Sequence, residues 1–321
     1  MGATAGPACP EARKEISDSP RAHIRSIVIC HGSYLSRTIT IRETNYPGAG
    51  MPEPHNPVDL YDNAYGNYAA DVYRQIRLAT YGEDLGQTSW VTNEESRAIP
   101  QTLQLTPASR VLEIGCGSGG YALHVATATG CSIVGVDIND AGVRNANTLA
   151  RARHLADRVS FERCDVSKAL PFPDAAFDAA FANDVLCHIP GRPALLQEVF
   201  RVLRPSARLL FSDALIIGGA VTHQEIATRS SIGYYIFTPP GHNERLIQDA
   251  RFHLLAAADT TEGAAAIAQR WRDARDQHRE ALISMEGLLT FDGLQQFLSC
   301  VSTLSSERRL LRYLYTAQKP G

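Results

Sequence analysis

Long apolar runs and a strong net charge are both absent from this sequence. No stretch approaches the ~20 consecutive apolar residues that a membrane-spanning helix needs. The 31 basic and 34 acidic residues nearly cancel, which leaves a net charge of −3 and no electrostatic footprint for nucleic acid. We therefore expect a cytoplasmic protein that binds neither membranes nor nucleic acids.

Cysteine pairs at metal-binding spacing are also absent. The seven cysteines are an odd number and include no C-x-x-C pair, so the sequence predicts neither a disulfide framework nor a zinc site. Free cysteines in or beside strands behave as small apolar residues. We expect no metal site and a structural role for the cysteines, which are Cys9, Cys30, Cys116, Cys131, Cys164, Cys187 and Cys300.

Residues 1–50 lack the features of a targeting segment. A secretory signal needs an apolar core of about 7–15 residues, and the brief run from Ile27 to Cys30 is too short. Acidic residues such as Glu11 and Glu15 argue against a transit peptide. We expect this segment to be a disordered leader, and we expect Met51 to be the first residue of the natural protein.

A glycine-rich loop follows a short apolar stretch within residues 110–120. Val111 to Ile114 are typical of a buried strand, and a helix is expected from about Tyr121. Glycine lets the backbone turn tightly and approach a ligand without an intervening Cβ. The loop glycines are Gly115, Gly117, Gly119 and Gly120. This arrangement predicts a nucleotide-binding loop at the first strand–helix turn of an α/β sheet.

An acidic residue at the end of the strand sets this loop apart from a dinucleotide-binding loop. The dinucleotide pattern G-x-G-x-x-G places a pyrophosphate on the helix N-terminus. Here the spacing is Glu113-x-Gly115-x-Gly117-x-Gly119. A carboxylate beside the loop would repel a pyrophosphate, whereas it suits a phosphate-free ligand that carries ammonium and hydroxyl groups. An NAD-dependent oxidoreductase is therefore the less favoured interpretation.

Acidic residues recur after the next expected strands. Asp137 lies 18 residues after Gly119 (137 − 119), where a carboxylate is placed to accept hydrogen bonds from ribose hydroxyls, and Ile138 follows it. Asp165 comes after the third strand. The expected elements are strands over 132–136, 159–163, 179–182 and 208–213, and a helix over 195–205 that Pro205 ends.

This ordered set of motifs, over residues 108–214, resembles the ubiquinone/menaquinone-biosynthesis-like group of class I S-adenosylmethionine-dependent methyltransferases. The resemblance implies an α/β fold with a doubly wound, mostly parallel seven-stranded sheet, and S-adenosyl-L-methionine as cofactor. It also implies methyl transfer to a small-molecule acceptor, with the choice among oxygen, nitrogen and carbon left open. The cofactor-binding residues that it implies are Glu113, Gly115, Cys116, Gly117, Gly119, Asp137, Ile138, Asp165, Val166 and Asn183.

Residues 51–107 are rich in aromatic residues and are expected to form an N-terminal helical lid. Tyr61, Tyr65 and Tyr68 fall on one face of a helix over 59–78. Tyrosines at this spacing suit either packing against the core or a lid over cofactor and acceptor. We expect Tyr65 to bind the acceptor.

The polar stretch 81–90 is expected to form a loop outside the core, before a helix that begins with the capping box Thr92-x-x-Glu95. Gln87 and Trp90 in this loop are candidates for contact with the acceptor or the methionine end of the cofactor. Solvent-exposed turn residues are the alternative interpretation.

Residues 215–321 are expected to supply substrate cap helices and the closing strands of the sheet. Tyr234 is a further candidate for acceptor binding. A helical insertion of this size would, together with the lid, enclose a small acceptor. The expected elements are a connection over 215–220, a helix that starts at Thr222-x-x-Glu225, a shaped loop over 232–241, a helix capped by Asn243 and ending near Arg251, a strand over 252–258, helices over 261–284 and 291–305, and a strand over 310–318.

His188 lies just beyond the strand over 179–182, beside the expected position of the methyl group. Histidine titrates near neutrality, which suits a general base for an acceptor that loses a proton. A structural role is the alternative, and Asp213 is a weaker candidate for the base.

A non-catalytic S-adenosylmethionine-binding protein is the second candidate function. Metal assistance is disfavoured because Asp184 and Asp213 are too few acidic ligands, and a homodimer is left open.

Overall fold

The computed structural model describes residues 24–27, 39–42, 58 and 60–321, and divides the chain into two units after His55. In the first unit, β1 (Ile24–Ile27) pairs antiparallel with β2 (Ile39–Arg42). The expected leader over 1–50 and the expected start at Met51 otherwise fall outside the described residues. Within the described part of the chain, no helix is long and apolar enough to cross a membrane.

The second unit is built on a seven-stranded sheet with the order β5-β4-β3-β6-β7-β9-β8, which confirms the predicted fold class. Strands β3 to β7 are parallel, and β9 runs antiparallel to both of its neighbours. The strands are β3 (Arg110–Ile114), β4 (Ser132–Asp137), β5 (Val159–Arg163), β6 (Phe177–Ala182), β7 (Leu203–Ile217), β8 (His253–Asp259) and β9 (Leu310–Gln318).

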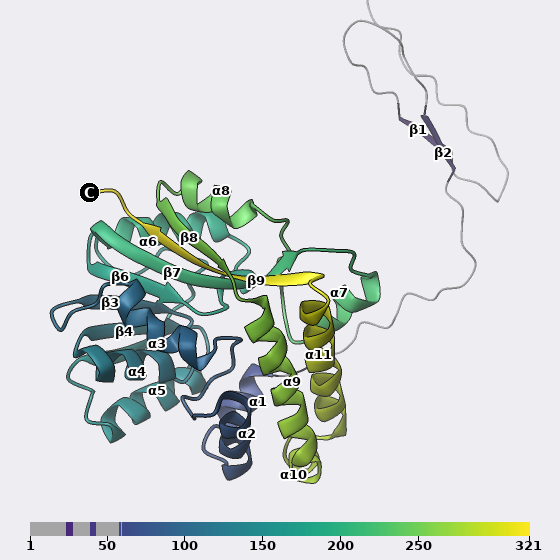
Figure 1. Ribbon diagram of the computed structural model, residues 1–321, viewed down its shortest axis with the longest axis horizontal. Coiled ribbons are helices and arrows are strands. Elements are labelled where there is room, and N and C mark those ends of the chain that lie inside the picture. Colours follow the sequence, from purple (N-terminus) through teal and green to yellow (C-terminus); the bar gives the residue numbers. More distant parts are fainter. Residues whose placement is uncertain (1–23, 28–38, 43–57, 59) are drawn as a thin grey trace, which may run out of the picture. The chain divides into compact units, whose positions relative to one another are not determined.

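Helices cover both faces of this sheet, because successive strand residues point to opposite sides. Leu112 and Ile114 of β3 pack in a core with α6 (Arg192–Val202) and α8 (His242–Asp249). The core on the other face contains Val111 together with residues of the helices α3 (Asn93–Thr102), α4 (Gly120–Thr129) and α5 (Asp140–Ala152). Figure 1 shows α4 and α5 on one side of the sheet and α6 and α8 on the other.

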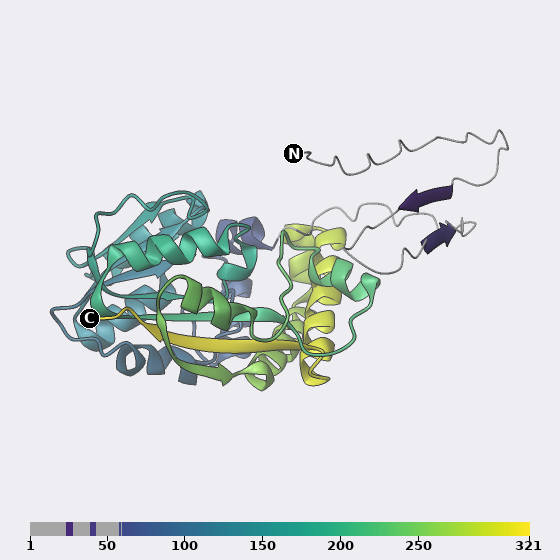
Figure 2. The same cartoon turned by 90° about the horizontal axis from the view of Figure 1, so that it is seen from above.

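The lid and the C-terminal insertion pack into one further hydrophobic core at one end of the sheet (Figure 2). Trp90 of the lid lies there with Trp271, Phe291 and Phe297 of the insertion. Its helices are α1 (Tyr61–Gly66), α2 (Asp71–Tyr81), α9 (Thr261–Gln277), α10 (Arg279–Glu286) and α11 (Leu288–Ser306). The insertion has three helices where two were expected, because Gly287 and His278 interrupt it.

Several local expectations are confirmed and others are wrong. Both capping boxes form, at Thr92 for α3 and at Thr222 for α7 (His223–Arg229). The stretch 59–78 is not one helix, since residues 67–70 separate α1 from α2, and residue 59 is outside the described part. The stretch 81–90 is a loop as expected, but it is largely buried rather than outside the core.

Two corrections concern the C-terminal half of the sheet. The helix expected to end at Pro205 ends at Val202, and Pro205 lies inside β7, which extends through residues 215–217 that were expected to be a connection. Asn243 does not cap α8; it lies within the helix, and Gly241 precedes the first turn. Its amide instead donates to the buried Asp213 carboxylate at 2.9 Å.

Candidate functional site

A cavity of about 350 Å³ opens at the carboxyl ends of the parallel strands, as expected for an α/β sheet. One wall is the loop after β3, and another is the turn after β4 at Asp137 and Ile138. The lid residues Tyr61, Tyr65 and Trp90 cover it from a third side. The cavity therefore lies between the nucleotide-type loop and the aromatic cap.

The glycines of the loop are required by backbone geometry. Gly115, Gly117 and Gly119 have φ of +71°, +51° and +77°, in the left-handed region that side chains disfavour. A Cβ on Gly117 would lie 2.6 Å from the hydroxyl of Tyr65. The lid tyrosine therefore lies directly against the loop, which leaves no room for a side chain between them.

Asp137 organises the next wall of the cavity. Its Oδ2 accepts a hydrogen bond from the Gly117 amide and its Oδ1 accepts one from the Asn139 amide, both at 2.8 Å. Burial raises the pKa of Asp137, although those amides oppose the shift. Each carboxylate oxygen keeps a further lone pair. A pair of hydroxyl donors can therefore still bind to this carboxylate.

An apolar slot follows beside Asp137. Ile138 lines the cavity with 62% of its side chain exposed, while Val166 opposite is buried. Asp165 also lines this end, and hydrogen bonds from Ser167 and Lys168 lower its pKa. An exposed aliphatic side chain next to a carboxylate suits a flat, amine-bearing ring. Cys116 contributes to the wall beside it.

Three buried polar atoms near the loop have no hydrogen-bond partner, namely Glu113 Oε2, Ser118 Oγ and Asn183 Nδ2. Ser118 and Asn183 line the cavity, so a bound ligand can complete their hydrogen bonding. Glu113 is 1% exposed and lies behind the loop rather than in the cavity wall, and burial raises its pKa well above the usual range. Nothing in the sequence had singled out Ser118.

His188 also lines the cavity, in the 3₁₀ turn Leu186–His188. Its Nδ1 is 3.1 Å from the Tyr234 carbonyl oxygen. Because a carbonyl oxygen only accepts, the neutral ring carries its proton on Nδ1. Nε2 then accepts from the Tyr61 hydroxyl at 3.1 Å. Desolvation lowers the pKa of His188 to about 4, so the imidazole is neutral at pH 7.

The predicted acceptor-binding residues have different surroundings. Tyr65 lines the cavity and its hydroxyl lies 3.1 Å from that of Thr88. Trp90 lines the cavity too, but its ring packs mainly against Trp271 and Phe297. Gln87 also lines the cavity, but its side-chain amide is used within its own loop.

Tyr234 is 58% exposed at the cavity mouth. Its carbonyl, rather than its ring, contacts His188. Two cavity residues that sequence reasoning missed lie nearby. Tyr235 has its ring centroid 4.4 Å from that of His188, and Arg229 has its guanidinium 4.5 Å above the Tyr235 ring.

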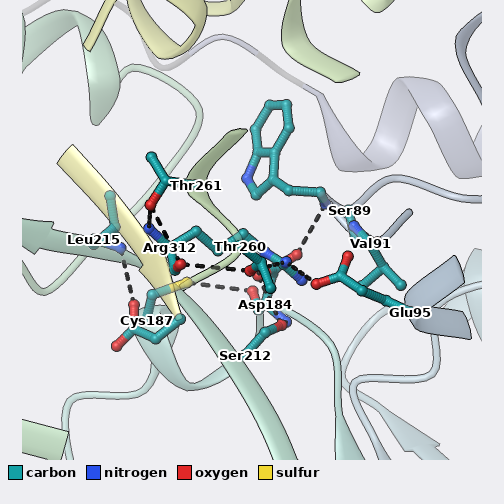
Figure 3. Close-up of polar contacts among 12 residues, drawn as sticks. Ser89, Val91, Glu95, Asp184, Cys187, Ser212, Leu215, Thr260, Thr261 and Arg312 are labelled. Carbon is teal, nitrogen blue, oxygen red and sulfur yellow. Dashed lines mark hydrogen bonds and ion pairs between the residues drawn. The ribbon is translucent and has the colours of Figure 1, made fainter. Parts of the chain in front are cut away.

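A buried polar network joins the lid to the sheet (Figure 3). Asp184, in the left-handed conformation with φ of +57°, accepts from the Trp90 amide and the Ser212 hydroxyl, both at 2.8 Å. Arg312 of β9 donates to Asp184 at 2.9 Å and to Glu95 at 2.6 Å. Asp184 is therefore paired with Arg312, which it shares with Glu95, and it fixes the position of the loop that carries Trp90.

Asp213 does not line the cavity, so the expectation that it serves as a base is wrong. It is fully buried and forms an ion pair with Arg192 at 2.6 Å. Among residues 60–321, no group of three or more His, Cys, Asp or Glu side chains could hold a metal ion.

The cavity fits S-adenosylmethionine on the chemistry of its walls. Asp137 has lone pairs for two ribose hydroxyls, and the slot beside Ile138 suits adenine. Asn183 and Ser118 have unused hydrogen-bonding capacity for the amino-acid end. The loop amides of Gly115 and Cys116 both donate to the Val136 carbonyl, so they are not directed at a phosphate.

Comparisons with known proteins agree with this fit. A family profile described as "Methyltransferase domain" matches residues 112–211. "27-O-demethylrifamycin SV methyltransferase" of Amycolatopsis mediterranei is 35% identical over 159 residues, which cover 50% of this chain and only 56% of that relative. "O-methyltransferase rstn1" of Aspergillus nomiae is 32% identical over 171 residues, which cover 52% of this chain and 75% of that protein.

A solved structure with the same fold is that of phosphoethanolamine N-methyltransferase 2 from Haemonchus contortus in complex with phosphomonomethylethanolamine and S-adenosylhomocysteine. It matches with a TM-score of 0.68 at 21% identity, over 83% of this chain and 61% of that chain. The fold, the cavity and the relatives agree. The chain belongs to the class I S-adenosylmethionine-dependent methyltransferase family.

Proposed function

We propose that this protein transfers a methyl group from S-adenosylmethionine to a small-molecule acceptor. The observation that carries the proposal is the cavity itself. Its glycine loop is bordered by the carboxylate of Asp137 rather than by groups that bind phosphate. Its lining also includes the aromatic side chains of Tyr61, Trp90 and Tyr235, and its volume of about 350 Å³ suits a small molecule.

In this proposal the cofactor is held at the β3–β4 end of the cavity. Asp137 binds the ribose hydroxyls, Ile138 and Val166 enclose the adenine, and Asp165 accepts from its amino group. Gly115, Cys116, Gly117 and Asn183 line the methionine end, with Gly119 turning the loop into α4. S-adenosylmethionine supplies an activated methyl group on a sulfonium, from which a neutral thioether departs. Glu113 does not contact the cofactor in this proposal, because it lies behind the loop, where its carboxyl group is hydrogen-bonded to the Ala122 backbone amide.

Holding the acceptor in line with the methyl group supplies most of the rate acceleration in this proposal. Correct positioning is worth up to about 7–11 kcal/mol of the activation barrier. The rings of Tyr65, Trp90 and Tyr234 are proposed to position the acceptor and to exclude water. Gln87 contributes indirectly, because its amide shapes the loop that carries Trp90.

An acceptor that loses a proton would pass it through Tyr61 to His188. The Tyr61 hydroxyl occupies His188 Nε2, so the acceptor proton moves to the Tyr61 oxygen as the Tyr61 proton moves to Nε2. With a pKa of about 4, His188 is always ready to accept a proton at pH 7 but is a weak base. This favours acceptors whose proton becomes acidic during transfer.

The acceptor atom is left open. Relatives include O-methyltransferases and a phosphoethanolamine N-methyltransferase of Triticum aestivum, so neither class is favoured by likeness. A non-catalytic protein that binds S-adenosylmethionine as a regulator is the second candidate function. The aromatic-lined part of the cavity beside the proposed cofactor site supports the enzyme, because a protein that only binds the cofactor needs no second compartment for an acceptor.

The test begins with the affinity of the full-length protein for S-adenosylhomocysteine, measured by isothermal titration. We expect Asp137→Asn to weaken this affinity by tenfold or more, on the order of 1.5–3 kcal/mol for hydrogen bonds to a charged group. Asp140→Asn is the matched control, since Asp140 is exposed three positions further on. Equal affinity in wild type and Asp137→Asn would contradict the assigned cofactor site.

Activity is then measured with a methyl-labelled donor over a library of small metabolites. Transfer of label to any acceptor, lost in Asp137→Asn and retained in Asp140→Asn, supports the enzyme. Stoichiometric cofactor binding without label transfer to any compound favours the non-catalytic alternative.

A further inference from the structure

Among the residues that the structure describes, one buried arginine has no carboxylate partner. Four other buried arginines each form an ion pair: Arg77 with Asp84, Arg192 with Asp213, Arg275 with Glu286, and Arg312 with Asp184 and Glu95. Arg229 is 1% exposed, yet it forms no ion pair with any residue that the structure describes. Its Nη1 has no hydrogen-bond partner at all.

Arg229 lines the cavity beside Tyr235, whose ring lies against His188, in the part that the proposed function gives to the acceptor. Its guanidinium carbon lies 4.5 Å above the ring of Tyr235, 5.0 Å above that of Phe297 and 5.8 Å above that of Trp90. Aromatic faces attract a cation, and the C-terminal end of α7 adds a favourable dipole. These contacts hold the guanidinium in place without neutralising its charge, since it stays protonated in proteins.

The rest of the cavity does not neutralise this charge. Asp137 and Asp165 are assigned to the cofactor in the proposed function, and Asp184 accepts its hydrogen bonds from Trp90, Ser212 and Arg312 rather than from Arg229. The groups that face Arg229 are Tyr61, Tyr235, Cys187 and His188, and none of them carries a negative charge at pH 7. A buried charge without a partner lowers the stability of the folded protein. Such a charge in a cavity is a candidate for binding a ligand of opposite charge.

We propose that the acceptor is a monoanion whose carboxylate binds Arg229. This inference rests on the proposed function and names the substrate class of the same site. Nη1 of this guanidinium keeps its N–H donors free for a carboxylate oxygen, while Tyr235 is hydrogen-bonded to the same guanidinium. The lining supplies one permanent positive charge and aromatic walls, so it fits a single negative charge on an apolar body better than a doubly charged phosphate ester.

The test compares three probes on the full-length protein saturated with S-adenosylhomocysteine. The probes are benzoate, its neutral analogue benzamide, and phenyl phosphate, and their dissociation constants are measured by isothermal titration. We expect benzoate to bind about tenfold or more tightly than benzamide, and at least as tightly as phenyl phosphate. Equal affinity for benzoate and benzamide would overturn the proposal. Tighter binding of phenyl phosphate would overturn the assignment to a carboxylate.

Substitution of Arg229 supplies the second arm. Arg229→Met keeps the length and apolar bulk of the side chain, and we expect it to abolish the preference for benzoate while benzamide affinity changes less than threefold. Arg245→Met, on an exposed arginine of α8, is the matched control and should keep the preference. A preference that survives Arg229→Met would contradict the proposal.

Folding and cofactor binding are monitored separately. Because Arg229→Met removes an unpaired buried charge, we expect its thermal midpoint to equal or exceed that of the wild type in the absence of ligand. If this variant does not fold, Arg229→Lys is used in its place. Lysine keeps the positive charge but lacks the planar set of N–H donors of a guanidinium, so we expect the preference for benzoate over benzamide to be reduced. A wild-type protein that binds no S-adenosylhomocysteine would refute the proposed function, whereas one that binds it without preferring benzoate would refute this inference alone.

Discussion

At His188, the hydrogen bonds already formed limit what the side chain can do. The Nδ1–H group donates a hydrogen bond to the Tyr234 carbonyl oxygen, and Nε2 accepts one from the Tyr61 hydroxyl. Desolvation lowers the pKa to about 4 from 6.5. A histidine in this state serves as a hydrogen-bond acceptor that orients Tyr61, and it takes up a proton only when the reaction delivers one.

The lowered pKa predicts a defined pH dependence of stability. Between about pH 6.5 and pH 4 the unfolded chain binds a proton at His188 that the folded protein does not, so the free energy of unfolding falls as the pH falls. This single group contributes a slope of at most about 1.4 kcal/mol per pH unit. Above pH 6.5 its contribution is constant.

Urea denaturation of wild type and His188→Asn at several pH values measures this effect. The stability advantage of the wild type over the variant should shrink from pH 7 toward pH 4.5. His154→Asn is the control, because His154 is exposed. If the difference in free energy of unfolding between wild type and His188→Asn stays constant over this pH range, the lowered pKa is contradicted.

The residues proposed to hold the cofactor could be chosen from the sequence because their structural roles are local. Gly115, Gly117 and Asp137 act through backbone turns and strand ends, and these follow from a short, ordered pattern. Arg229 could not be found in this way. A single arginine at the end of a seven-residue helix resembles a surface residue, and only the packing of Trp90, Tyr235 and Phe297 around it reveals that it is buried.

At the scale of elements, the lid and the glycine loop touch through backbone atoms. A Cβ on Gly120 would lie 1.4 Å from the Leu85 carbonyl oxygen, a clash that no change of rotamer relieves. We expect Gly120→Ala to displace the lid loop and to lower the free energy of unfolding by about 1–3 kcal/mol or more. Affinity for S-adenosylhomocysteine should fall with it, because Tyr65 and Gly117 lose their contact.

Gly66→Ala provides the matched control for that experiment. Gly66 also lies in the lid, at the end of α1, but a Cβ there meets no atom within 4 Å. Denaturation and titration of the two variants should therefore differ clearly. If Gly120→Ala behaves like Gly66→Ala, the lid does not lie against the loop as described.

The Asp184–Arg312–Glu95 network connects the lid loop, β6 and β9. Arg312→Met would leave Asp184 buried and without its cationic partner, which typically costs about 3–5 kcal/mol. Chemical denaturation should show this loss, whereas Arg97→Met should change stability by less than about 1 kcal/mol because Arg97 pairs with Glu83 on the surface. If Arg312→Met lowers the free energy of unfolding no more than Arg97→Met does, Arg312 does not stabilise the buried Asp184 carboxylate.

The sequence predicted the wrong position for a helix end and the wrong role for a capping residue, in both cases because tertiary contacts change the local structure. Pro205 is typical of a helix end, but here it lies in β7. The pairing of β7 with β6 shifts register between Leu203 and Arg208, and within this stretch Ser206 has a φ of +67°. Such an irregularity tolerates the missing amide of proline. Asn243 is typical of a helix cap, and the buried charge of Asp213 draws it into the core instead.

At the scale of the whole molecule, the sheet and the cavity both lie in one of the two units. Asn56–Gly321 holds the sheet, the cavity and the cap with their hydrophobic cores. Strands β3 to β6 were predictable to within two residues, because each ends in turn chemistry that the sequence displays, whereas β7 runs several residues further at both ends than expected. The joint core of lid and insertion was not predictable in detail, since it depends on contacts between segments about 200 residues apart, such as Trp90 and Phe297.

This division predicts that a shortened protein beginning at Asn56 folds and binds cofactor by itself. Its free energy of unfolding should match that of the full-length chain, because every contact of the cavity described above lies within residues 56–321. Addition of S-adenosylhomocysteine at about 100 times its dissociation constant should stabilise both proteins by about 2.7 kcal/mol. Denaturation of both proteins with and without ligand measures this. A shortened protein that folds but gains no stability from the ligand would mean that residues 1–55 contribute to the cofactor site.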